Sequence, residues 1–392
     1  MGFYLNNKSK VSLYKSEVQR PYFVDKTLIL SELFPLIESG NSHICITRPR
    51  RFGKTVMANM IGAFFEKGVD TKNIFEQLKI SKSPEYEKHR NKHDVIYIDF
   101  SKMPEDCESY EQYIGRIISR LKKDLIREYP DADYEEDDAL WDILDCIFDM
   151  YDGQKFIFVM DEWDCVFHKA FITREDQQKY ISFLSNLLKD HGYVELSYMT
   201  GILPIAKYSS GSELNMFLEY TMASEEKFNE YFGFTESEVD ELFEKYLKIC
   251  ETPTITREQL RLWYDGYATK AGERMYNPRS VVTALSNNNI GNYWTSSGPY
   301  DEIFYYIKNN VADVKADLAL MVSGEAVQAK VREYAAASMN LSTKNEIFSA
   351  MVVYGFLSYE NGKVRIPNKE LMECLEDQLE TKQHRCQVEE IK

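Results

Sequence analysis

His43-Ile44-Cys45-Ile46-Thr47-Arg48-Pro49-Arg50-Arg51-Phe52-Gly53-Lys54-Thr55 is the stretch that decides the fold, because an apolar run breaks there into a basic turn and then a helix. Gly53 lets the backbone bend so that successive N–H groups point into one concavity, which suits an anionic phosphate. Lys54 would reach the outer phosphates and the Thr55 hydroxyl would hold Mg²⁺, while the helix that begins at Lys54 adds its positive dipole end. The stretch therefore predicts a phosphate-binding loop between a buried strand and a helix.

The helix after this loop has an apolar face at helical spacing, and Gly68 follows where a C-terminal cap is expected. The match to G-x-x-x-x-G-K-[ST] is incomplete, since Arg48 occupies the position of the first glycine. Pro49 has no N–H, but the donors that cradle phosphate come mainly from Arg51 onward. The alternative is a basic loop that caps an ordinary strand-to-helix turn. The residues expected to bind nucleotide are Arg50, Arg51, Phe52, Gly53, Lys54, Thr55 and Val56.

A second chemical landmark is Phe156-Ile157-Phe158-Val159-Met160-Asp161-Glu162, five apolar residues followed by two acids. A wholly apolar strand is typical of a parallel sheet covered on both faces, and such sheets bind ligands at the C-terminal ends of their strands. Asp161 is therefore expected to hold Mg²⁺ or its waters, and Glu162 to orient and deprotonate an attacking water. Asp164 has three interpretations: an acid that assists the site, a solvated acid, or a cap on the following helix.

A further run, Val194 to Gly201, alternates in polarity and ends at Thr200 and a glycine, which fits a strand beside the two acids. Thr200 would then place a hydroxyl within reach of the γ-phosphate or of the attacking water. A Thr-Gly turn without a ligand gives the same spacing, so both interpretations stay open.

Other segments extend this α/β pattern along the first part of the chain. Leu28–Glu38 and Tyr110–Tyr129 have helical periodicity, whereas Val95–Phe100 and Leu218–Met222 read as strands. Thr235 and Glu238 then form a helix capping box, near which the α/β domain should close.

Beyond Ser237 the chain reads as helical, which predicts a lid domain. Arg279 follows a proline turn and opens a helix, so it could contact phosphate, although an exposed structural arginine is the alternative. The helix Lys344–Val353 precedes two short runs that flank Asn361-Gly362, a strong hairpin signal that suggests a winged-helix unit. The predicted division is an α/β domain over 1–236, a helical lid over 237–335 and a winged-helix-like unit with a tail over 336–392.

Composition narrows the class of protein. The 392 residues contain no apolar run of membrane-spanning length, and the start lacks the apolar core of a signal peptide, so we expect a cytoplasmic protein without a membrane partner. Seven cysteines without a C-x-x-C pair fit reduced thiols better than disulfides or a zinc site. A net charge of −16 gives no support to nucleic acid as a partner, although a local basic groove would be compatible with it.

Several of these motifs together resemble the bacterial AAA-ATPase-like domain family, which is related to signal-transduction ATPases with numerous domains. They are Tyr22–Thr27, Arg48–Thr55, Asp161–Asp164, Met199–Pro204, Tyr276–Ser280 and Ile366–Asn368. The resemblance covers most of residues 1–375, and it implies that an arginine at the first loop position is usual. Members often carry a C-terminal PD-(D/E)XK nuclease domain, for which too few residues follow Asn368, so we expect no nuclease activity from this chain.

Taken together, the sequence predicts an Mg²⁺-dependent ATPase that acts as a switch, with slow and regulatory hydrolysis. The alternative is a nucleotide-binding scaffold that recruits protein or nucleic acid without turnover; the presence of both Lys54 and Glu162 favours the enzyme. An unknown protein partner or self-association fits either interpretation. The sequence does not distinguish ATP from GTP.

Overall fold

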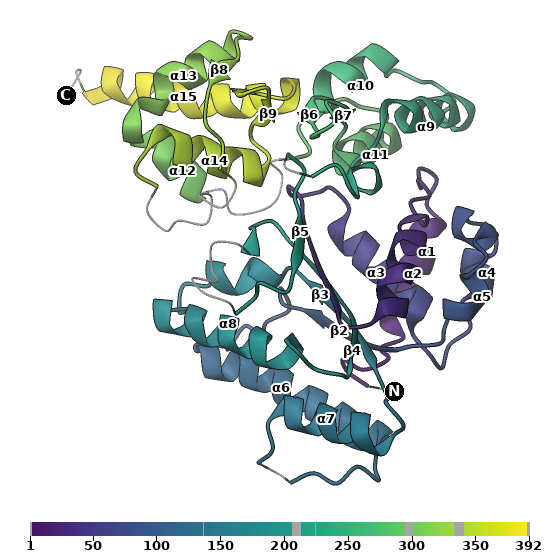
Figure 1. Cartoon of the computed structure of the whole chain (residues 1–392). Helices are drawn as coiled ribbons and strands as arrows, with labels where there is room; N and C mark the ends of the chain where they lie inside the picture. The colour runs from purple at the N-terminus through teal and green to yellow at the C-terminus, as the bar shows by residue number, and fades with distance from the viewer. Residues whose placement is uncertain are drawn as a thin grey trace. The chain divides into compact units, whose positions relative to one another are not determined.

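A computed structural model describes residues 2–135, 137–205, 213–223, 225–294, 301–332 and 341–389 of the chain (Figure 1). Its packing defines two compact units. Unit 1 comprises Met1–Thr47, Lys54–Gly201 and Ile205–Glu219, and unit 2 comprises Arg48–Gly53, Ile202–Pro204 and Tyr220–Lys392. The predicted phosphate loop, Arg48–Gly53, therefore packs as part of unit 2, although the residues before and after it in the chain belong to unit 1.

The sheet of unit 1 has five strands in the order β2-β3-β4-β1-β5. The pairs β2 with β3, β3 with β4 and β1 with β4 are parallel. The strands β1, β2, β3 and β4 are buried along nearly their whole length, as expected for a parallel sheet that is covered on both faces. The bounds are β1 (Ser42–Thr47), β2 (Asp94–Asp99), β3 (Phe156–Asp161), β4 (Val194–Gly201) and β5 (Leu218–Tyr220). The predicted parallel α/β fold is confirmed.

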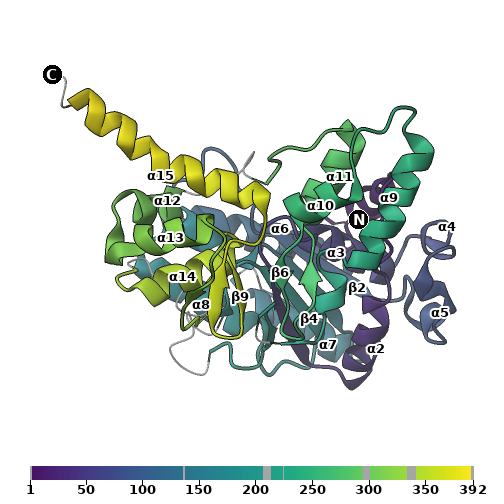
Figure 2. The same cartoon turned by 90° about the horizontal axis from the view of Figure 1, so that it is seen from above.

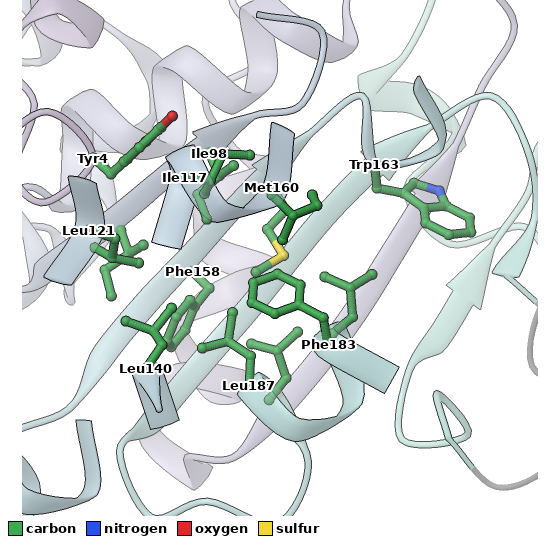
Figure 3. Close-up of a cluster of buried hydrophobic side chains, with 14 of the residues drawn as sticks. Tyr4, Ile98, Ile117, Leu121, Leu140, Phe158, Met160, Trp163, Phe183 and Leu187 are labelled. Atoms are coloured by element: carbon green, nitrogen blue, oxygen red, sulfur yellow. The ribbon is translucent and has the colours of Figure 1, made fainter. Parts of the chain in front are cut away.

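Helices cover both faces of this sheet, with α1, α2 and α3 on one side and α6, α7 and α8 on the other (Figure 1). Figure 3 shows Phe158 and Met160 of β3 packed among Leu121, Leu140 and Leu187 from the second group of helices. Side chains alternate along a strand, so Asp161 lies on the opposite face, where α3 packs. The bounds are α1 (Ser9–Val18), α2 (Ile29–Ser39), α3 (Lys54–Phe65), α4 (Lys72–Phe75), α5 (Tyr86–His89), α6 (Tyr110–Glu128), α7 (Leu140–Met150) and α8 (Arg174–Leu188).

Unit 2 combines helices with two small antiparallel sheets (Figure 2). Its helices are α9 (Glu236–Ile249), α10 (Arg257–Tyr264), α11 (Pro278–Asn287), α12 (Asp301–Lys308), α13 (Val314–Val322), α14 (Lys344–Tyr354) and α15 (Lys369–Glu389). Its strands are β6 (Tyr267–Ala268), β7 (Arg274–Met275), β8 (Val327–Gln328), β9 (Ser358–Glu360) and β10 (Lys363–Arg365). The pair β6–β7 and the helix α15 were not predicted from the sequence.

The helix cap and the hairpin turn predicted in unit 2 are present in the structure. Thr235 caps α9 and forms a capping box with Glu238. Asn361 and Gly362 both have positive φ angles, as a tight hairpin turn requires, and they join the antiparallel strands β9 and β10. The helix α14 precedes this hairpin, but a winged helix, like the three-part division of the chain, stays a prediction. Within the described ranges, none of the helices is long and apolar enough to span a membrane.

Candidate functional site

The strongest site in unit 1 is centred on Asp161, the last residue of β3, whose carboxyl is fully buried. Thr200 Oγ1, from the end of the adjacent strand β4, donates a 2.8 Å hydrogen bond to Asp161 Oδ1. Burial, and then the charge of Asp99, raise the pKa of Asp161, while Thr200, Thr55 and Lys54 act in the opposite direction. The other oxygen, Oδ2, is buried without a hydrogen-bond partner in the part of the chain that the structure describes. Asp161 therefore presents a buried carboxyl oxygen that a ligand could satisfy.

The start of α3 supplies the cation and the hydroxyl that the sequence predicts. Lys54 is the first residue of this helix and is only 5% exposed, whereas Thr55 is exposed. Both lie close enough to lower the pKa of Asp161, and the effect of Lys54 comes from its charge. The structure thus brings together Lys54, Thr55, Asp161 and Thr200, four of the predicted residues, within unit 1.

Glu162 follows Asp161 directly and has an unusual backbone. Its φ and ψ angles, 55° and 44°, lie in the left-handed region, and it precedes the short helix Trp163–His168. A residue other than glycine adopts this conformation at a cost of about 1–3 kcal/mol, and such residues cluster at functional sites. Its side chain is half-buried. The two consecutive acids therefore differ in environment: Asp161 is fully buried, whereas Glu162 is partly exposed.

Close packing shapes the turn after Thr200. A Cβ atom placed on Gly201 would overlap the side chains of Trp163 and Asp164, so glycine is required where β4 ends. Asp164 is 1% exposed, and His168 Nε2 lies 4.0 Å from its Oδ2. The expectation of a solvated acid at Asp164 is therefore wrong, because the turn at Gly201 covers it.

Arg48, at the position of the missing glycine, is a buried structural residue of unit 2. Its Nη1 donates a 2.8 Å hydrogen bond to the carbonyl of Tyr220, and its Nη2 donates a 2.8 Å hydrogen bond to Asn229 Oδ1. The guanidinium carbon also lies 5.1 Å from the centre of the Phe232 ring, a cation–π distance. Contacts with residues more than 170 positions away in sequence thus hold the start of the loop.

The rest of the loop is held by other parts of unit 2. Phe52 is 1% exposed and packs edge-to-face on Tyr267, with 4.9 Å between the ring centres. Arg51 adopts a positive φ of 69° and donates a 3.2 Å hydrogen bond from Nε to the carbonyl of Trp294. Gly53 has a φ of 87°, so the bend predicted for this glycine is confirmed.

A buried acid in unit 2, Glu370, was missed by the sequence analysis. Its Oε1 accepts hydrogen bonds from the backbone N–H groups of Tyr293 and Trp294, and its carboxylate also accepts one from Ser280 Oγ. Burial raises the pKa of Glu370 to about 7, and these hydrogen bonds and the charge of Arg51 oppose that shift. No local pattern marks this residue, because all its partners lie at least 76 positions earlier in the chain.

Three other predicted residues have less specific surroundings. Val56 is 38% exposed and Arg50 is half-buried. Arg279 is exposed in the first turn of α11, so its contact with phosphate stays a prediction. The contact of Thr200 with a nucleotide also stays a prediction, since its hydroxyl is directed to Asp161.

The residues present fit Mg²⁺. This ion prefers oxygen ligands, and it commonly binds one or two protein oxygens together with water and phosphate. The orphaned Asp161 Oδ2 and the Thr55 hydroxyl are such oxygens. Among the described residues, no cluster of three or more His, Cys, Asp or Glu side chains could hold a metal without other ligands.

A parallel α/β sheet with a Gly-Lys-Thr turn after β1 and an acid at the end of β3 defines a P-loop nucleotide-binding fold. The family described as "Predicted AAA-ATPase" matches residues 15–210, half of the chain, and this protein belongs to that family. The match spans β1 to β4 and all the predicted site residues except Arg279.

Known proteins show more distant similarity. An uncharacterized protein in the vnfD 5′ region of Azotobacter chroococcum mcd 1 is 24% identical over 282 residues, 71% of this chain. The aligned region spans 51% of that relative, so the chain corresponds to about half of its length. Among solved structures, the Walker-type ATPase PABY2304 of Pyrococcus abyssi has 10% identity and a TM-score of 0.46 over 88% of this chain and 94% of its own. The Aeropyrum pernix ORC2 protein, in ADPNP–ADP complexes, has 12% identity and a TM-score of 0.42 over 92% and 94%.

Proposed function

We propose that this protein binds ATP together with Mg²⁺ and hydrolyses it slowly, as a nucleotide-controlled switch. The observation that carries the proposal is the buried Asp161 carboxyl, which lies among the hydroxyls of Thr200 and Thr55 and the ammonium of Lys54. Burying a carboxylate with an unsatisfied oxygen is costly unless a ligand completes it. Membership of the AAA-ATPase family supports a nucleotide as that ligand.

The residues divide the work as follows. The backbone of Arg50 to Val56 and the ammonium of Lys54 bind the phosphates, while Asp161 and Thr55 hold Mg²⁺. When bound, the metal neutralises charge that develops on the phosphate oxygens. Thr200 positions Asp161 by its hydrogen bond. Glu162 accepts a proton from the attacking water, for which a partly exposed carboxylate is better suited than the buried Asp161.

The packing of the loop supports a switch rather than a simple hydrolase. Arg48, Arg51 and Phe52 contact residues of unit 2, and Lys54 continues directly from this loop into α3. Any adjustment of the loop on binding phosphate therefore acts on contacts within unit 2. Arg279 is proposed as an additional phosphate contact. These contacts do not identify the partner that would respond to the bound nucleotide, whether another protein or a second copy of this chain.

The test is to compare the full chain with Lys54→Ala, using Lys123→Ala as the matched control, since Lys123 is exposed on α6. Calorimetry with ATP, with and without Mg²⁺, measures binding, and phosphate release measures turnover. We expect Lys54→Ala to abolish binding, because the loop loses the ammonium aimed at the outer phosphates. ATP at about 100 times its Kd should also stabilise the parent by about 2.7 kcal/mol.

Two results would count against the proposal. Unchanged ATP affinity in a folded Lys54→Ala variant would remove the phosphate-loop assignment. Tight binding of ATP to the parent with no release of phosphate would instead favour a scaffold that binds nucleotide without turnover. A parallel titration with GTP shows which base the site prefers.

A further inference from the structure

A cavity of about 440 Å³ lies in unit 1, between the N-terminal segment, the end of β2 and α6. Three cationic side chains line it, Lys10, Lys102 and Arg116, together with one acid, Asp99. None of Lys54, Thr55, Asp161 and Glu162 contributes to its lining. Its volume falls within the range of about 300–1,000 Å³ that is usual for small-molecule sites.

Lys10 is the most unusual residue of this cavity. It is only 5% exposed, and its ammonium lies 3.6 Å from the centre of the Tyr97 ring. It forms no ion pair with any described residue. Burial lowers the pKa of Lys10 to about 8, with the charge of Lys102 as the next cause. The charges of Asp99, Asp161 and Glu66 act in the opposite direction, and the Tyr97 ring also stabilises the cation, but none of these acids forms an ion pair with its ammonium in the described part of the chain.

The other two cations make the excess of positive charge larger. Arg116 has no hydrogen bond or ion pair within the described ranges, and it is half-buried on α6. Lys102 pairs with Asp99 at 3.3 Å. Subtracting the single acid from the three cations leaves a local charge of about +2 at neutral pH, in a chain whose net charge is −16. This concentration of positive charge is what an anion would neutralise.

Hydrogen bonds hold the N-terminal segment that forms one side of the cavity. Asp124 accepts hydrogen bonds from the backbone N–H groups of Tyr4 and Leu5, at 2.7 and 3.3 Å. Leu5 forms an antiparallel bridge with Ile96 of β2, and Asn6 Nδ2 donates a 2.7 Å hydrogen bond to Asp94. The N-terminal segment is thus fixed against the edge strand β2, and the aromatic residues Tyr4 and Tyr97 line the cavity there.

We propose that this cavity binds a small organic anion, a phosphate or carboxylate group attached to a flat ring. The anionic group would pair with Lys10 and Arg116, and the ring would pack on Tyr4 and Tyr97. A limited volume favours a small molecule over a nucleic-acid strand, which needs an extended basic groove, and the negative net charge also disfavours such a strand.

The experiment measures binding of phenyl phosphate, benzoate and the neutral benzyl alcohol to the full chain by ligand-observed NMR. It uses the parent and Lys54→Ala, which disables the phosphate loop. Phenyl phosphate should bind both proteins equally, and benzyl alcohol should bind at least about tenfold more weakly, a difference of about 1.4 kcal/mol. Arg116→Gln should weaken phenyl phosphate at least about tenfold, because it removes a two-pronged donor. Lys123→Gln, an equal loss of charge on an exposed part of α6, should leave binding unchanged.

A second measurement locates the ligand. Phenyl phosphate should protect Lys10, but not Lys54, from trinitrobenzenesulfonate, with the labelled lysines mapped by mass spectrometry. This measurement and Arg116→Gln keep the proposal testable if Lys10→Gln does not fold. The proposal is overturned if binding disappears with Lys54→Ala, if the neutral alcohol binds as well as the anions, or if none of the probes saturates below about 10 mM. Stronger binding of a single-stranded oligonucleotide through Arg116 would also overturn it, in favour of a nucleic-acid surface.

Discussion

The acidic end of β3 and the phosphate loop differ in what holds them. Asp161 lies at the end of a buried strand and is hydrogen-bonded by Thr200 of the next strand, so its position follows from the parallel sheet itself. Arg48 and Phe52 of the loop depend instead on residues of unit 2 that are far away in sequence. A change at the acidic end should therefore affect ligand chemistry and leave the fold intact, whereas a change in the loop should affect stability as well.

Glu162→Gln should give the largest effect and separates chemistry from binding. The change keeps shape and hydrogen bonding but removes the charge that orients and deprotonates water. Loss of one general base typically lowers the rate by about 10²–10⁴-fold. ATP should bind as in the parent, since Lys54, Thr55 and Asp161 are unchanged. Calorimetry and phosphate release measure the two quantities.

Glu105→Gln is the control for Glu162→Gln, since Glu105 is exposed in the loop after β2. Hydrolysis at the parental rate in Glu162→Gln would show that this acid is not the base. Loss of ATP binding would show instead that Glu162 is structural or a direct ligand of the metal.

Phe52→Ala tests the other side of the comparison. The ring is buried against Tyr267 and lies close to Gly233, so its removal leaves a cavity within unit 2. Such truncations cost about 3–5 kcal/mol in the free energy of unfolding. Urea denaturation followed by tryptophan fluorescence measures the loss. Leu262→Ala, at a side chain that is 59% exposed, should change stability by less than about 0.5 kcal/mol. Equal stability of the two variants would mean that the loop is not anchored by Phe52.

Glu370→Gln should reveal a pH-dependent contribution to stability in unit 2. Because the pKa of Glu370 is raised from 4.5 to about 7, the folded chain retains a proton that the unfolded chain releases. Stability should therefore fall as the pH rises from about 4.5 to about 7, by up to about 3 kcal/mol. A glutamine oxygen can still accept the two backbone hydrogen bonds, so the variant should lose this pH dependence.

Urea denaturation at a series of pH values compares the parent with Glu370→Gln. The two curves should nearly coincide at low pH and separate toward pH 8, where the variant should be the more stable protein. Parallel curves across the whole range would show that Glu370 does not titrate there.

The two regions also differ in how far the sequence could predict them. The local sequence of Phe156–Asp161 and of Val194–Gly201 predicts two buried strands. Because these strands are neighbours in the sheet, their ends bring Asp161 and Thr200 together. The partners of Arg48 could not be found this way, since Tyr220 and Asn229 carry no pattern that links them to the loop. Long-range packing, rather than local preference, also fixes Glu370.

Smaller differences have local causes. Gly68 is predicted to cap the C-terminus of α3, but the helix ends earlier, at Phe65, because Glu66 and Lys67 pair with His93 just before β2. The strands β6 and β7 have only two residues each, which is too few to show the alternation of apolar and polar side chains that marks a strand in a sequence. The helix α15 follows the hairpin β9–β10, in a segment for which the sequence predicts only a tail.

Thr200→Val is the smallest and sharpest change at the acidic end. Valine keeps the volume of the side chain but removes the hydroxyl that donates to Asp161 Oδ1, so the carboxyl loses the bond that orients it. Loss of such a supporting hydrogen bond typically lowers metal affinity about 10–100-fold. We expect the Mg²⁺ concentration that half-saturates ATP hydrolysis to rise by this factor, with ATP affinity at saturating Mg²⁺ nearly unchanged.

Thr269→Val is the matched control, because Thr269 is buried in unit 2 and its hydroxyl makes no hydrogen bond with any described residue. If ATP affinity falls at saturating Mg²⁺ while the Mg²⁺ requirement stays constant, Thr200 contacts the phosphate directly, and the hydrogen bond to Asp161 belongs only to the nucleotide-free state.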